Sequence, residues 1–147
     1  MVHLFGGLSR WGVRIDIDPV VRPDVIADAW LPPFVANAFD VVILDPPYIA
    51  INQQMKQHLL QAASFIAKES VIWFHTQWIA SGTKLSMRRA WLVRVGDSCA
   101  CRCIQVFQVT RGPKVFHRPH FTRGPAIKYN RWLVGNQGLP FATEISE

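Results

Sequence analysis

The chain has 147 residues and a net charge of +6; half of its residues are apolar and 12% are aromatic. This length fits one domain with a real core, and this composition excludes a disordered chain. No apolar run approaches the roughly 20 residues of a membrane span, and no basic region followed by a long apolar stretch marks a secretory signal, so we expect a cytoplasmic protein that contacts no membrane.

The charge is unevenly distributed. Residues 1–50 carry six acids and three bases, whereas residues 111–131 carry six bases and no acid. An acidic front half and a basic tail predict a small-molecule site followed by a surface that binds a polyanion.

The first predicted strand is the short apolar run at residues 2–5, which ends at Gly6 and Gly7. Glycine suits a turn there because a Cβ would restrict the backbone or block the approach of a ligand. Only residues 8–12 precede the next strand, fewer than the dozen or so that a crossover between parallel strands normally needs. We therefore expect either a first helix cut to about one turn or a first strand that lies elsewhere. Trp11 is interpreted as a core residue, with covering the gap as the alternative.

Two further strands are predicted at residues 13–19 and 24–30, and each carries acids toward its end. Asp16 lies at the end of the second strand, and Asp18 lies two residues on, where a cap or turn role before a proline is the favoured interpretation. Asp28 lies near the end of the third strand.

The stretch around residues 41–48 organises the chain. Val41 to Leu44 is an apolar, largely β-branched run, typical of a strand buried on both faces of a parallel sheet. Asp45-Pro46-Pro47-Tyr48 then ends it, because a proline has no N–H and holds the residue before it extended. This stiff loop displays a carboxylate, free carbonyls and a ring at the edge where open α/β sheets bind ligands.

The remaining elements of the predicted core follow in order. They are a helix at 51–68, a strand at 71–74, a short helix at 80–87, and strands at 89–95 and 101–110 joined by a hairpin at 96–98. His75 follows the 71–74 strand and either holds a loop, the favoured interpretation, or touches substrate.

The three cysteines, Cys99, Cys101 and Cys103, share one face of a strand. Zinc sites usually use Cys-x2-Cys spacing in loops, and an odd number of cysteines does not form a disulfide framework, so we interpret these residues as reduced thiols. His117 and His120 have no acid or cysteine nearby. The sequence therefore predicts no metal site.

Asp45-Pro46-Pro47-Tyr48 resembles the (Asp/Asn/Ser)-Pro-Pro-(Tyr/Phe/Trp) motif of the S-adenosylmethionine-dependent amino-methyltransferases, the N6-adenine and N4-cytosine DNA methylase family. The resemblance covers roughly residues 2–110. It implies an α/β, Rossmann-like class I methyltransferase sheet, mainly parallel with an antiparallel end hairpin, here with a shortened first helix. We expect residues 1–110 to be this core and 111–147 to be a basic, aromatic extension packed on or next to it.

The resemblance also implies roles for individual residues. Cofactor-binding residues would be the aromatic-Gly-Gly turn and the acids of the next two strands: Phe5, Gly6, Gly7, Asp16 and Asp28. Asp16 would bind the ribose hydroxyls and Asp28 the adenine amino group. Asp45 and the Pro46 carbonyl would accept both N–H bonds of an exocyclic amine, which frees its lone pair from the ring, while Pro47 stiffens the loop and Tyr48 stacks on the extruded base.

The expected reaction is therefore methyl transfer to N6 of adenine in DNA, with N4 of cytosine as the related DNA target. An RNA methyltransferase acting on guanine N2 or adenine N6 is the alternative, and a second one is a non-catalytic nucleic-acid-binding subunit of a methyltransferase pair. A homodimer or a separate specificity subunit is compatible with either.

The tail interleaves bases with aromatic residues, a pattern that suits a phosphate backbone and unstacked nucleotides. The candidate nucleic-acid-binding residues there are Arg118, Phe121, Arg123, Lys128, Tyr129 and Arg131.

Overall fold

A computed structural model describes residues 1–47, 53–76, 85–94 and 101–110, with only the backbone of Gln53 and Cys101. All of these belong to one compact unit that spans Met1–His117. Tyr48, the hairpin turn and the expected extension at 111–147, with all of its candidate nucleic-acid-binding residues, lie outside the described residues.

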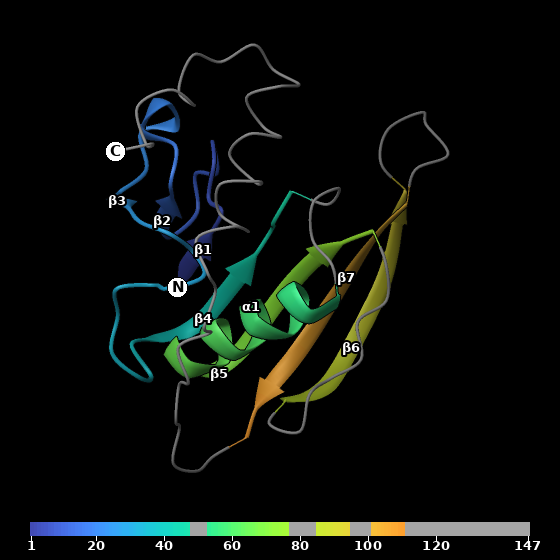
Figure 1. The fold of residues 1–147 in the computed structure, drawn as a ribbon. Helices are drawn as coiled ribbons and strands as arrows, with labels where there is room; N and C mark the ends of the chain where they lie inside the picture. The colour runs from blue at the N-terminus through green and yellow to red at the C-terminus, as the bar shows by residue number, and fades with distance from the viewer. Residues whose placement is uncertain (48–52, 77–84, 95–100, 111–147) are drawn as a thin grey trace. The chain divides into compact units, whose positions relative to one another are not determined.

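The described residues form one sheet with the order β3-β2-β1-β4-β5-β7-β6 (Figure 1). The elements are β1 (Val2–Leu4), β2 (Val13–Asp16), the 3-10 helix η1 (Pro19–Val21), β3 (Val25–Ile26), β4 (Phe39–Leu44), α1 (Gln53–Ile66), β5 (Ala67–His75), β6 (Leu85–Arg94) and β7 (Cys101–Val109). The neighbouring strands β3, β2, β1, β4 and β5 pair in parallel. Strand β7 pairs antiparallel with both β5 and β6. The expected mainly parallel sheet with an antiparallel end hairpin is confirmed.

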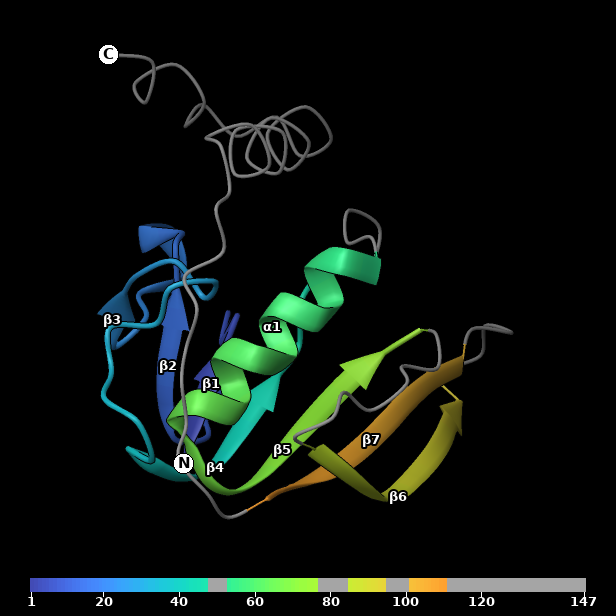
Figure 2. The ribbon, with the colours of Figure 1, turned by 60° about the horizontal axis from the view of Figure 1, so that its bottom comes forward.

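The register across the sheet separates two faces. Val42, Val71 and Phe107 lie side by side in one row, all fully buried, and they share one core cluster with residues of α1. Because side chains alternate along a strand, the neighbouring row that contains Ile43 and Ile72 faces the other way. Figure 2 shows α1 lying over one face of β4 and β5.

The connection from β1 to β2 contains turns and no helix, so even the single helical turn expected there is absent. Trp11 in this connection is 73% exposed, which excludes the core role considered for it. The tight path is possible because three of its residues, Phe5, Gly7 and Gly12, have positive φ angles, a region open to glycine and costly for Phe5.

Two other elements differ from expectation. The third strand is only Val25–Ile26, because Asp28 begins a turn in which its backbone carbonyl accepts from the N–H of Leu31. Residues 85–87, expected to be helical, belong to β6. Leu85 pairs with Val109 of β7 and is buried in the core, so tertiary pairing outweighs local helix preference there.

In the part of the chain that the structure describes, no helix combines the length and the apolarity needed to cross a bilayer.

Candidate functional site

The candidate site lies at the carboxyl ends of β1 and β4, which are parallel neighbours in the centre of the sheet. The chain leaves β1 toward β2 and leaves β4 toward β5, in opposite directions, and open α/β sheets bind ligands at such a switch point. The N–H of Asp45 donates to the carbonyl of Leu4 at 3.4 Å, which ties the two strand ends together. The structure thus places the glycine turn after β1 beside the start of the Asp45-Pro46-Pro47 loop.

Glycine is needed at the two positions of the turn for different physical reasons. The N–H of Gly6 donates to the carbonyl of Ile15 at 2.8 Å, and a Cβ on Gly6 would lie 2.8 Å from the Cβ of Arg14, so the close approach of β2 requires glycine. Gly7 has a φ of +45°, and a Cβ built there would meet no atom within 4 Å. The backbone of Gly7 therefore has open space beside it in the direction of a Cβ.

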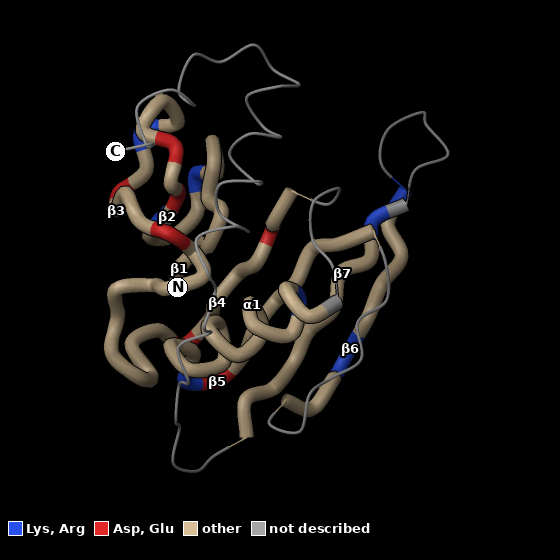
Figure 3. The backbone as a smooth tube through the Cα atoms, in the orientation of Figure 1, with Lys and Arg blue, Asp and Glu red and all other residues tan. Residues whose placement is uncertain are grey.

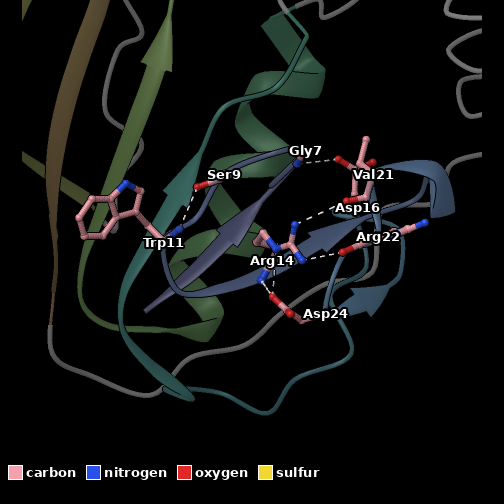
Figure 4. A network of polar contacts seen from close by, with 8 residues as sticks. All are labelled: Gly7, Ser9, Trp11, Arg14, Asp16, Val21, Arg22 and Asp24. Atoms are coloured by element: carbon pink, nitrogen blue, oxygen red, sulfur yellow. Dashed lines mark hydrogen bonds and ion pairs between the residues drawn. The ribbon is translucent and has the colours of Figure 1, made fainter.

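Asp16 links this turn to the end of β2. One carboxylate oxygen accepts from the N–H of Gly7 at 3.0 Å (Figure 4). The other accepts from the N–H of Asp18 at 3.1 Å. An ionised carboxylate has about four acceptor sites, so two such bonds leave capacity for the hydroxyls of a diol. Asp18 caps η1 by accepting from the N–H of Val20 at 2.9 Å, and the cap role favoured for it is confirmed.

Arg14 fixes the end of β2 from the other side. Its Nε lies 3.3 Å from a carboxylate oxygen of Asp24, and its guanidinium also donates to the carbonyl of Arg22 at 2.6 Å (Figure 4). Hydrogen bonds from the backbone and then the side chain of Arg14 lower the pKa of Asp24, so this exposed carboxylate stays ionised. The clamp holds the η1 segment against β2 without an intervening long helix.

Asp28 lies two residues beyond β3, on the same side of the sheet as Asp16. Its Oδ1 accepts from the N–H of Trp30 at 2.9 Å. Burial raises the pKa of Asp28, and this hydrogen bond opposes the rise. A half-buried carboxylate with one local partner is suited to accept from an amino group.

His3 is a residue of the site that sequence reasoning missed. It lies in the middle of β1, and both of its ring nitrogens are buried without a hydrogen-bond partner among the described residues. Burial lowers the pKa of His3, while the carboxylates of Asp45 and then Asp16 oppose that shift, so the imidazole lies in the field of both acids. The available signal was a polar residue inside an otherwise apolar short strand.

His75 is the last residue of β5 and is 3% exposed. Its ring lies 5.7 Å from that of Trp73, with which it shares the face covered by α1. Burial, and then the positive charge of Lys56 on α1, lower the pKa of His75 to about 4. This favours the structural interpretation of His75, and it identifies Lys56, itself buried, as a second residue that the sequence did not single out.

The described residues include no group of three or more His, Cys, Asp or Glu side chains able to hold a metal ion. Cys103 is a free, buried thiol whose pKa is raised by burial. It is an inert core residue, consistent with the interpretation of the cysteines as reduced.

No family model and no curated protein matches the sequence. Among solved structures, the fold matches magnesium protoporphyrin IX methyltransferase from Synechocystis PCC 6803, which was crystallised with bound S-adenosylmethionine. The TM-score is 0.58 at 10% identity, over 74% of this chain and 69% of that one. The chain therefore has the Rossmann-like fold of the class I, S-adenosylmethionine-dependent methyltransferases, as expected.

The low pKa of His75 predicts a pH-dependent stability. Between pH 6.5 and about 4 the unfolded chain binds a proton at this residue that the folded chain does not, so the free energy of unfolding falls as the pH falls through this window. We expect His75→Gln to make the urea midpoint less dependent on pH between 7.5 and 4.5. The same pH dependence in the variant and in the parent protein would show that another group is responsible.

Proposed function

We propose that this protein transfers a methyl group from S-adenosylmethionine to an exocyclic amine of a nucleic-acid base, with N6 of adenine in DNA as the target. One observation carries the proposal. The Asp45-Pro46-Pro47 loop follows the central strand β4 directly, beside the glycine turn of β1, in a sheet with the methyltransferase fold. The neighbour's porphyrin substrate does not transfer to this chain, because only the fold is shared at this identity.

The residues of the glycine turn and of the two strand ends beside it fit the cofactor. The open space beside Gly7 accommodates its methionine part, the remaining acceptor sites of Asp16 suit its ribose hydroxyls, and Asp28 suits its adenine amino group. When bound, the cofactor supplies a methyl group already activated by the positive sulfur. The protein's contribution is then to position the amine and to exclude water.

Asp45 positions the amine. Its carboxylate and the backbone carbonyl of Pro46 accept the two N–H bonds of the target, which draws the nitrogen lone pair out of conjugation and makes it available to the methyl group. Pro46 is buried, its ring fixes its φ angle, and Pro47 after it restricts it to an extended conformation, so its carbonyl is held rigidly. Tyr48, outside the described residues, is proposed to stack on the extruded base.

The tail is proposed to contact the nucleic acid through Arg118, Arg123, Lys128 and Arg131, with Phe121 and Tyr129 stacking on bases. Basic and aromatic composition supports this assignment.

A non-catalytic, nucleic-acid-binding subunit of a methyltransferase pair is the second candidate. The observation in its favour is the missing helix between β1 and β2, which removes part of the wall that encloses the cofactor in this fold. A chain of this kind binds nucleic acid without binding S-adenosylmethionine, which separates the two candidates experimentally.

Replacing Asp45 tests the proposed chemistry. We expect Asp45→Ala to abolish transfer of a tritiated methyl group to DNA while leaving the affinity for S-adenosylmethionine nearly unchanged, because this carboxylate faces the amine. Asp40→Ala is the matched control, since Asp40 lies in β4, the strand that precedes Asp45, is exposed and pairs with Lys68 at 3.5 Å. An Asp45 variant that keeps most of its turnover would contradict the amine-binding role proposed for Asp45.

Asp16 and Asp18 form a second matched pair for the cofactor. Loss of a charged hydrogen-bond partner costs about 1.5–3 kcal/mol, so Asp16→Ala is expected to weaken S-adenosylmethionine roughly tenfold or more. Asp18→Ala removes only the η1 cap and leaves that affinity intact. Calorimetry on variants first shown to be folded measures both, and the reverse ranking would mean that the cofactor's ribose lies elsewhere.

A further inference from the structure

Charge is unevenly distributed across the described sheet. The acids Asp16, Asp28 and Asp45 lie at the ends of β2, β3 and β4, whereas the described residues of β6 and β7 contain four arginines and no acid (Figure 3). The arginines are Arg88, Arg89, Arg94 and Arg102. This basic hairpin lies at the end of the strand order opposite β3, two strands away from β4.

A register shift between Met87 and Arg89 interrupts the pairing of β6 with β7. Met87 pairs with Phe107 on the face that α1 covers, whereas after the shift Arg89 pairs with Val106, which faces the other way. The intervening Arg88 donates from Nε to Oε1 of Gln108 at 2.5 Å. Gln108 belongs to the same alternate row as Val106, so the bulge directs two successive arginines to the face opposite α1.

The same face continues toward the carboxyl edge of the sheet. Trp91 pairs with Ile104 and Val93 pairs with Arg102, two residues farther along each strand. Trp91 is 46% exposed, which leaves much of its ring open to a partner. An indole among arginines has the composition of surfaces that bind unstacked nucleotides.

The row that contains Trp91 also leads to the proposed amine site. Trp91 pairs with Ile104, and Ile104 pairs with Phe74 of β5. Phe74 follows Trp73, which pairs with Leu44 of β4. Asp45 follows Leu44, so it continues this row. Three strand spacings of about 4.8 Å separate β4 from β6, so Trp91 lies on the order of 15 Å from Asp45, about the length of four stacked nucleotides.

A second copy of this chain is the obvious competing occupant, because β6 is an edge strand and long edges are templates for strand pairing. Pairing of β6 with its own copy would bring three arginines and no acid from each strand into one pair of strands. Like charges opposite one another destabilise such a pair, whereas a polyanion complements them.

We propose that the face of β6 and β7 opposite α1 binds the sugar-phosphate backbone of a single nucleic-acid strand, with Arg89 and Arg102 on phosphates and Trp91 stacked on a base. The inference rests on the proposed function, since it names where the strand that carries the target base is held. It assigns the hairpin a role in addition to that of the tail.

Fluorescence anisotropy with a labelled single-stranded oligodeoxynucleotide tests the arginines. Each phosphate contact contributes about 0.7 to the slope of log affinity against log salt, so Arg89→Ala with Arg102→Ala is expected to flatten the slope by up to about 1.4. Lys68→Ala is the control, because Lys68 is an exposed base at the opposite end of β5. An unchanged slope in the double variant would overturn the proposal.

Trp91→Ala is expected to weaken single-strand binding about 5- to 150-fold without changing the salt slope. Leu92→Ala is its matched control, since Leu92 is the next residue, is 78% exposed and points to the other face. Equal affinities for the two variants, or a dimer in sedimentation velocity that only Trp91→Ala converts to monomer, would assign the surface to something other than nucleic acid. An RNA probe of the same length shows which backbone is preferred.

Methyl transfer by the same variants separates this proposal from the proposed function. If the parent protein methylates DNA and the hairpin variants have an unchanged KM, the function stands and the hairpin assignment fails. If the parent protein methylates neither DNA nor RNA but the variants lose affinity as described, the hairpin assignment stands and the catalytic function fails.

Discussion

The hydrogen bond from the N–H of Gly7 to the carboxylate of Asp16 is the interaction on which the site depends. It joins the ends of β1 and β2, which the short connection between them brings together without a helix. The same carboxylate accepts from Asp18, and Gly6 packs against Arg14 so closely that no other residue fits. One aspartate side chain thus holds the turn in the shape that leaves open space beside Gly7.

This hydrogen bond explains how β1, β2 and β3 stay in place although no long helix connects them. Arg14 and Asp24 fix η1 and β3 by polar contacts at the surface, while one apolar core extends from β1 and β2 to α1, β4, β5 and β7. Asp16, Asp28 and Asp45 lie at or just beyond the carboxyl ends of β2, β3 and β4, and the four arginines of β6 and β7 lie at the other end of the strand order. In the account proposed here, the cofactor occupies the first, the nucleic acid approaches along the second, and Asp45 lies between them.

Much of the fold follows from sequence because it depends on strong local signals. The structure confirms the strand predicted from the apolar run at 41–44 and its end before the prolines that follow Asp45. It also confirms the strand predicted at 101–110. Two predictions were wrong: the length of the third strand and the helix at residues 85–87. The turn at Asp28 ends the strand, and pairing with β7 makes residues 85–87 extended, and neither is a local property. His3 and Lys56 were missed because their importance comes from burial beside charges on other elements, and the bulge at Arg88 has no signature in the chain.

The central claim is that the turn held by Asp16 forms a working cofactor pocket despite the missing helix. Titration of the full chain with S-adenosylmethionine in a calorimeter tests it most directly. We expect saturable heat with one cofactor bound per chain. A folded protein that gives no heat of binding would contradict it and would favour the non-catalytic subunit instead.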